Sequence, residues 1–191
     1  MRFVCLTAAA MLVLPAALSA QQPATPPVNP IVAAFKSRIL GAHRNLAMAF
    51  DSIPESKYGY KPTPAQLTVG YIAQHVASDS YLFCNTFGAM KSNEDAKDRT
   101  TADSVKATWP KAELVTKLKA SFAFCAQALD QLTDASLAES TTMSFNGNSR
   151  TVTRAAMALG HALDLADHYS QIANYMRLNG LVPPSALPRG R

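Results

Sequence analysis

Apolar side chains recur every three or four residues in four separate stretches of this chain, the spacing that aligns residues along one side of an α-helix. The first stretch shows the pattern most fully, with Val32, Phe35, Ile39, Ala42, Leu46, Ala49 and Ile53. Pro54 follows directly and ends the helix, because a proline ring removes a backbone donor. The sequence therefore predicts a long first helix that ends before residue 54.

A second helix is expected after a proline-rich loop. Either Thr63 or Thr68 can serve as its N-cap, because a threonine hydroxyl accepts a hydrogen bond from the first turn. One side of this helix carries a mixed set of residues, Leu67, Tyr71, His75, Ser78 and Leu82. A histidine therefore occupies a face that otherwise points to the core.

Pro110 opens a third helix. Its apolar positions keep the same spacing, with Leu114, Leu118, Phe122, Cys125, Leu129 and Leu132. Residues 91–108, just before it, are polar and lack an apolar period, which indicates a long connection. Beyond it, Met143, Phe145 and the Asn146-Gly147 turn suggest a short extended excursion.

The fourth helix is expected from about Thr151 to Asn179, with Gly180 in the C′ position. Four helices with one long loop and no parallel-strand pattern predict an all-α helix bundle. A chain of 191 residues that is 48% hydrophobic can form one core without staples. We expect one domain over residues 31–184, followed by a tail at 185–191.

The first twenty residues have the pattern of a secretory signal peptide. Arg2 precedes a nearly unbroken apolar run to Leu18, which is too short for a transmembrane span. Cleavage after Ala20 is expected, and a cut after Ser19 is the close competitor. Residues 21–30 then form a proline-rich leader. The mature protein is expected in the periplasm or the medium, with no membrane anchor after cleavage.

The charge of the chain is modest. It carries 18 Lys and Arg against 13 Asp and Glu, a net charge of +5, and the basic residues are spread thinly. No basic cluster suits nucleic acid or lipid head groups. We therefore expect no nucleic-acid partner.

Cysteine use fits an exported chain. There are three cysteines and no CxxC pair, which argues against a zinc knuckle. Cys5 leaves with the signal peptide, and an oxidising compartment then favours a disulfide between Cys84 and Cys125. The alternative is two buried free thiols that act as small apolar residues.

Polar residues interrupt the inward side of the fourth helix, which runs through Met157, His161, Asp164, His168, Ile172 and Tyr175. A buried polar group without a partner costs about 1 to 3 kcal/mol. Asp164 and His168 are four residues apart, the spacing by which one helix offers two ligands to a metal ion. With His75 from the second helix they would form an open three-ligand site suited to Zn²⁺, Ni²⁺ or Fe²⁺.

A buried hydrogen-bond network is the alternative. In it Asp164 orients an imidazole, and Tyr169 or Gln171 completes the surroundings. His161 is about 10.5 Å along the helix from His168 at ~1.5 Å per residue, too far to share one ion readily. No general base is assigned. His161 lies one turn from Asp164 and is expected as a partner that holds the carboxylate, with a role as general base left open.

Several segments resemble the DinB and YfiT-like superfamily. The C-terminal signature is matched by DHYSQI at 167–172 and YMRLNGLVPP at 175–184, and earlier matches are KYGYKP at 57–62 and YIAQHVA at 71–77. The resemblance extends from about Pro30 to Pro184. It implies an antiparallel four-helix bundle with a long crossover between the second and third helices.

The resemblance also implies a divalent-metal site with one histidine from the second helix and a His-x-x-x-His pair from the fourth. His75 matches the first ligand and His168 the last. Asp164 stands where the family usually has a histidine, a change that either keeps a two-His, one-carboxylate site or marks weakened or lost metal binding. Family members include metal-dependent transferases and isomerases that use low-molecular-weight thiols.

Two classes of function follow from these expectations. The leading one is an exported metal-binding protein, a metal-dependent hydrolase or a thiol-using transferase that acts on a small molecule. Export argues against the cytosolic thiols that such relatives use. The competing class is a non-catalytic binding or structural module whose His/Asp residues form a hydrogen-bond network. A homodimer through an apolar helix face is open to either class.

Overall fold

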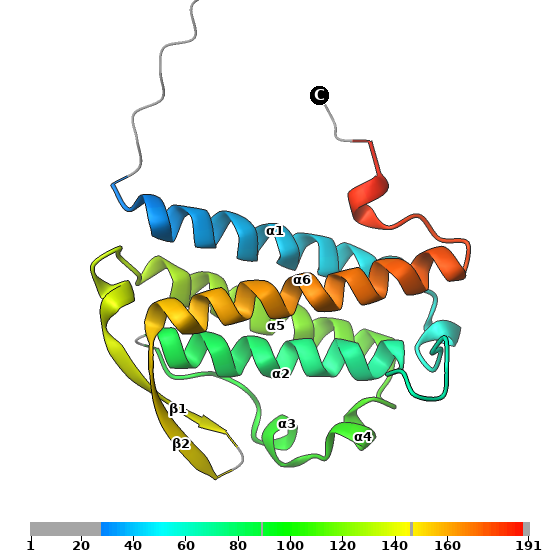
Figure 1. Ribbon diagram of the computed structural model, residues 1–191. Coiled ribbons are helices and arrows are strands. Elements are labelled where there is room, and N and C mark those ends of the chain that lie inside the picture. Colours follow the sequence, from blue (N-terminus) through cyan, green and yellow to red (C-terminus); the bar gives the residue numbers. More distant parts are fainter. Residues whose placement is uncertain (1–27, 89, 146, 189–191) are drawn as a thin grey trace, which may run out of the picture.

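A computed structural model describes residues 28–88, 90–145 and 147–188. The expected signal peptide, most of the expected leader and the last residues of the tail lie outside the described residues. The described chain is mostly helical (Figure 1). Its helices and strands are α1 (Pro30–Ser52), α2 (Val69–Phe87), α3 (Ala96–Thr100), α4 (Asp103–Lys106), α5 (Lys111–Asp130), β1 (Ser140–Phe145), β2 (Asn148–Thr153) and α6 (Arg154–Leu178). Three short 3₁₀ turns occur at Glu55–Lys57, Ser136–Ala138 and Pro184–Ala186.

The four long helices pack side by side. Contacts join α2 to α5 and α6, and α1 to the same two helices (Figure 1). Their apolar stripes meet in one core whose largest fully buried members include Ile39, Leu46, Phe50, Ile72, Phe87, Leu118, Leu165 and Ile172. These are the helices that the spacing of apolar residues predicts.

The helix ends follow from their capping residues. Thr68, rather than Thr63, is the N-cap of α2, and its Oγ1 accepts a hydrogen bond of 3.1 Å from the amide of Tyr71. α1 ends at Ser52, before the proline. Gly180, beyond the C-terminus of α6, has φ +73°, the left-handed conformation that a glycine adopts at low cost.

The all-α expectation is wrong in one detail. The expected excursion is an antiparallel hairpin in which Met143 pairs with Arg150 and Ser140 with Thr153. Because residues 148–153 pair with β1, α6 begins at Arg154 instead of near Thr151. Thr153 ends the strand and caps the helix, accepting a hydrogen bond of 3.2 Å from the amide of Ala156.

The expected long connection between α2 and α5 contains the short helices α3 and α4 and packs against α2. A Cβ at Gly70 would lie 2.4 Å from the carbonyl oxygen of Ala107, so only a glycine allows this approach. The Gly70 amide also donates a hydrogen bond of 2.8 Å to the carbonyl of Tyr58. In the described part of the chain, no helix has the length and apolar character needed to cross a membrane.

Candidate metal centre

Two helices bring His75, Asp164 and His168 together. His75 lies on α2, and the other two residues lie one turn apart on α6. One ligand atom from each of the three lies within 4.8 Å of the others. The rings of His75 and His168 meet nearly edge to face, with centroids 4.8 Å apart. We call these three residues the His-Asp site.

His168 is the most buried member of the His-Asp site. Its side chain is 8% exposed, and its Nε2 lies 3.3 Å from Oδ1 of Asp164. Its Nδ1 lies 3.2 Å from Oε1 of Gln171, whose amide donates to Asp167. Burial lowers the pKa of His168, but the hydrogen bond and charge of Asp164, aided by Gln171 and Asp167, outweigh it and leave the pKa raised.

Asp164 has one oxygen that the described residues do not satisfy. Its Oδ2 is buried and has no hydrogen-bond partner, although a buried carboxylate oxygen without a partner is costly. Imidazole nitrogens and a carboxylate oxygen are a ligand set that Zn²⁺, Ni²⁺ and Fe²⁺ accept. The residues present therefore fit a divalent metal.

Asp79 is a fourth polar residue at this place, and the sequence analysis missed it. Its Oδ2 lies 3.5 Å from Nε2 of His75, one turn earlier on α2. Burial raises the pKa of its carboxyl, as does the negative charge of Asp164, while His75 and His168 oppose the rise. His75 and Asp79 are four residues apart, as are Asp164 and His168, and this spacing in the sequence could have identified Asp79.

The three residues expected around the His-Asp site have different places. Gln171 contacts His168, as expected. The hydroxyl of Tyr169 instead accepts a hydrogen bond of 2.8 Å from the amide of Ser185 in the C-terminal segment. His161 is fully buried and packs against His43 and Phe83 rather than holding the Asp164 carboxylate.

Cys84 and Cys125 lie next to each other, on α2 and α5. Both are fully buried, and the structure pairs them, with Cα atoms 5.1 Å apart, within the range that a disulfide requires.

A groove of about 950 Å³ opens beside His75 and Asp79. One wall is the outer face of α2, with Tyr71 and Ser78, and the other is the connection that carries α3 and α4. Basic and acidic side chains both line it, namely Lys91, Arg99, Lys106, Glu94, Asp98 and Asp103. A small polar molecule in this groove would lie next to the His-Asp site.

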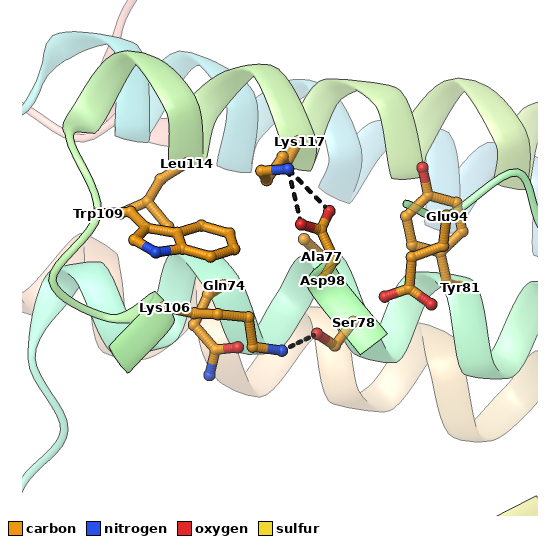
Figure 2. A pocket seen from close by; sticks show the side chains of 10 residues that line it. All are labelled: Gln74, Ala77, Ser78, Tyr81, Glu94, Asp98, Lys106, Trp109, Leu114 and Lys117. Carbon is orange, nitrogen blue, oxygen red and sulfur yellow. Dashed lines mark hydrogen bonds and ion pairs between the residues drawn. The ribbon is translucent and has the colours of Figure 1, made fainter. Parts of the chain in front are cut away.

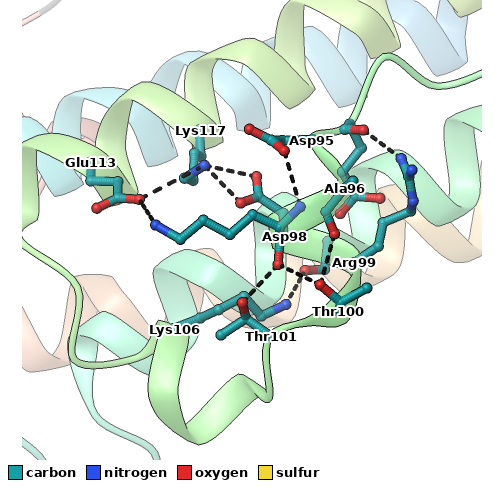
Figure 3. Close-up of polar contacts among 12 residues, drawn as sticks. Asp95, Ala96, Asp98, Arg99, Thr100, Thr101, Lys106, Glu113 and Lys117 are labelled. Atoms are coloured by element: carbon teal, nitrogen blue, oxygen red, sulfur yellow. Dashed lines mark hydrogen bonds and ion pairs between the residues drawn. The ribbon is translucent and has the colours of Figure 1, made fainter.

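Ion pairs fix the outer wall of the groove. Asp98 of α3 receives two hydrogen bonds from Nζ of Lys117 on α5, of 2.7 and 3.0 Å (Figure 3). Lys106 of α4 is buried, and its Nζ donates a hydrogen bond of 3.2 Å to Oγ of Ser78 on α2 (Figure 2). The connection is therefore tied to both helices that flank it.

Trp109 follows α4 and lines, with Leu114, a smaller pocket next to this groove (Figure 2). The ammonium groups of Lys97 and Lys117 lie 4.6 and 5.1 Å from the centre of its ring. Both distances suit cation–π attraction. The indole thus helps to hold two lysines whose charges would otherwise repel.

The fold and the site together define a class: mainly helical proteins with a candidate metal site between two long helices. Comparison with known families identifies which one. The model of the DinB superfamily matches residues 38–172. The chain belongs to the DinB superfamily. Comparison with curated proteins gave no match.

Solved structures share the fold at low sequence identity. A DinB-like protein from Bacillus cereus has a TM-score of 0.62 and 16% identity, over 80% of this chain and 95% of that one. A DinB-like protein from Bacillus subtilis has a TM-score of 0.58 and 20% identity, over 82% and 96%. A mycothiol-dependent maleylpyruvate isomerase has a TM-score of 0.58 and 14% identity, over 74% of this chain and 60% of that one.

Proposed function

We propose that this protein binds one divalent transition metal, Zn²⁺, Ni²⁺ or Fe²⁺, through His75, Asp164 and His168. The observation that carries the proposal is that Asp164 meets imidazoles from two helices while its buried Oδ2 has no partner among the described residues. A cation at this point would satisfy that oxygen. It would also offset the cost of placing three polar side chains on faces that pack toward other helices.

We further propose that α1, α2, α5 and α6 form the antiparallel four-helix bundle of the DinB/YfiT type, with residues 88–110 as its long crossover. The contacts among these helices support this arrangement. In it the two ligand-bearing helices, α2 and α6, are direct neighbours. The crossover then forms the outer wall of the groove beside His75.

The reaction class that we propose is a metal-dependent hydrolase or a thiol-using transferase that acts on a small molecule. A bound divalent cation supplies Lewis-acid activation of a water or a thiol. His75, 31% exposed in its side chain, borders the groove, and the groove suits a polar substrate. One protein of similar fold is named as a mycothiol-dependent isomerase, which agrees with the use of a thiol rather than with transfer as such.

We also propose that the protein is exported and that Cys84 and Cys125 form a disulfide in the exported form. The N-terminal sequence supports export, and the short distance between the two Cα atoms supports the bond. In an oxidising compartment such a pair is stable toward reduction. Export also favours a hydrolase over a transferase that depends on a cytosolic thiol.

A second candidate is a non-catalytic binding or structural module. One observation favours it, because both ring nitrogens of His168 have protein partners, Asp164 and Gln171. In this case the His-Asp site is a hydrogen-bond network and holds no ion. Stability would then be independent of metal.

Metal analysis of the purified full-length protein separates the two candidates. We expect one transition-metal ion per chain in the unsubstituted protein and loss of that ion in His168→Ala. Asp51→Ala is the control, because the Asp51 carboxylate is about half exposed on α1 and takes no part in the ligand set or in the hydrogen bonds around it, and this variant should keep the ion. Metal-free protein whose melting temperature is unchanged by chelator would contradict the proposal and favour the module.

A further inference from the structure

A second polar cluster lies inside the core, away from the His-Asp site. It joins His43 of α1, Cys125 of α5 and His161 of α6, and we call it the His-Cys cluster. One ligand atom from each residue lies within 4.8 Å of the others. All three side chains are buried, with 5% of His43 and none of the other two exposed.

The two imidazoles face each other with the spacing of metal ligands. The Nε2 atoms of His43 and His161 are 3.4 Å apart. Two nitrogens on one tetrahedral Zn²⁺, each at about 2.0 to 2.1 Å, lie roughly 3.4 Å from one another. The nitrogens therefore need little movement to accept a common ion.

Burial keeps both rings neutral. It lowers the pKa of His43 to about 3, and it lowers that of His161 well below the usual value, helped by the nearness of His43, since two protonated rings would repel each other. A neutral imidazole has a lone pair free for a metal, whereas a protonated ring has none. Each Nδ1 is buried, and none of the described residues offers it a hydrogen-bond partner, so the pair is a costly arrangement as a hydrogen bond alone.

Cys125 belongs to two arrangements that exclude each other. Bonded to Cys84, its sulfur is not a thiolate and cannot act as a thiolate ligand. Reduced, its thiolate would complete a His₂Cys set for a borderline or soft metal. Reduction by an external dithiol delivers two electrons and two protons to the disulfide, and the dithiol becomes a disulfide in turn. The Cys125 thiol then releases its proton to solvent when the metal binds.

We propose that His43, Cys125 and His161 form a second, fully buried transition-metal site, of the zinc or copper kind, when the Cys84–Cys125 bond is absent. The bond between the cysteines closes this site, and its reduction opens it. The oxidation state of the two cysteines would thus determine how Cys125 links the helices. Oxidised, it bonds covalently to Cys84 of α2; reduced, it is joined through an ion to His43 of α1 and His161 of α6. This site is independent of the His-Asp site.

Two matched variants test the proposal in a His168→Ala background, where the His-Asp site lacks a ligand. Cys84→Ser and Cys125→Ser both remove the disulfide, but only Cys84→Ser keeps the proposed ligand. With Co²⁺ as the probe, we expect Cys84→Ser to bind one ion, with sulfur-to-metal absorption in the near ultraviolet that Zn²⁺ displaces. Cys125→Ser should show no such absorption.

The ligand histidines provide the next check. Adding His161→Gln to the Cys84→Ser protein should abolish the absorption, while the far-ultraviolet circular dichroism stays helical. Equal Co²⁺ spectra for the two cysteine variants, or a spectrum that survives His161→Gln, would overturn the proposal.

A measurement without a cysteine substitution covers the case in which Cys84→Ser does not fold. The His168→Ala protein is reduced with a water-soluble phosphine and titrated with Co²⁺ beside an unreduced sample. We expect the absorption only after reduction. Its absence from reduced, folded protein rules the second site out, whatever the outcome at the His-Asp site.

Discussion

Nε2 of His168 lies 3.3 Å from Oδ1 of Asp164, one turn earlier on α6, while the other oxygen of Asp164 is buried and finds no partner in the part of the chain that the structure describes. The carboxylate thus orients the imidazole through one oxygen and leaves its second oxygen unsatisfied by those residues. In the resemblance to the DinB and YfiT-like superfamily, this position usually carries histidine. Measurements on Asp164 therefore test whether a carboxylate can replace histidine as a metal ligand at this position.

Substitution of Asp164 should separate ligand loss from ligand exchange. We expect Asp164→Ala to weaken metal affinity by more than about 100-fold, because loss of an outer partner alone costs about 10- to 100-fold. Asp164→His should keep the ion, since imidazole is also a ligand. Competition with a chromophoric chelator measures both affinities, and Asp51→Ala, which removes a carboxylate away from the site, is the control. Unchanged affinity in Asp164→Ala would exclude this carboxylate as a ligand.

Acid should destabilise the protein through His43. Burial lowers the folded pKa of this ring to about 3, from the 6.5 that is usual for histidine, so the unfolded chain binds the extra proton first as the pH falls. The stabilising effect of the neutral ring is complete above about pH 6.5 and is lost progressively toward pH 3. At about pH 5 the expected loss is roughly 2 kcal/mol.

Urea unfolding of His43→Leu at neutral pH and near pH 5 measures this term. Because leucine does not titrate, the free energy of unfolding should fall by about 2 kcal/mol less than in the unsubstituted protein. The comparison between two pH values within each protein removes the change in packing. Identical pH dependence in the two proteins would show that His43 does not stay neutral in the core.

The Cys84–Cys125 bond should be detectable by mass spectrometry after alkylation with and without reductant. The two cysteines are separated by 41 residues, and the chain-entropy model gives about 4 kcal/mol for a loop of this length. Cys84→Ser should therefore lower the free energy of unfolding by a comparable amount. Two alkylated cysteines in unreduced protein from the exported fraction would contradict this prediction.

The Asp98–Lys117 pair should matter more than a surface pair. The side chains of Asp98 and Lys117 are 12% and 23% exposed, whereas those of Asp51 and Lys119 are about half exposed. Asp98→Ala leaves a half-buried ammonium beside Trp109 and should cost about 1 to 3 kcal/mol. Asp51→Ala, the control, should cost under about 1 kcal/mol. Equal costs in urea unfolding would mean that the connection is not anchored there.

Export predicts a processed N-terminus. Expressed with its native N-terminus in a bacterial host, the protein should be recovered from the periplasm or medium with Gln21 as its first residue. A cut after Ser19 would give Ala20 instead. N-terminal sequencing and intact mass distinguish these results, and an unprocessed chain in the cytoplasm would contradict the prediction.

The parts of the fold that depend on apolar spacing were predictable from the sequence. The four long helices and the stop at Pro54 follow from periodicity and from proline. The start of α6 was not predictable in this way. Thr151 suits a helix cap, but it lies in β2 and pairs with β1 instead. The register of that hairpin depends on the pairing between the two strands, which the propensities of single residues do not specify.

The candidate site was predictable where two polar residues share one helix face, as Asp164 and His168 do. His75 required the resemblance and its place on a core-directed face. Asp79 and His43 carried the same signal and were missed. His43 lies four residues after Ile39 and three before Leu46, on the buried stripe of α1. Its pairing with His161 depends on how α1 and α6 meet, which spacing within one helix does not specify.

Gly70 gives the groove beside His75 its outline without contributing a side chain to it. A methyl group there would press on the Ala107 carbonyl at 2.4 Å, and main-chain atoms yield only by moving the whole segment. That segment carries Lys106, whose amine reaches back to Ser78. The absence of a Cβ at Gly70 therefore sets how closely this segment approaches α2. A larger residue at position 70 would change the shape of the groove while leaving the residues that line it chemically unchanged.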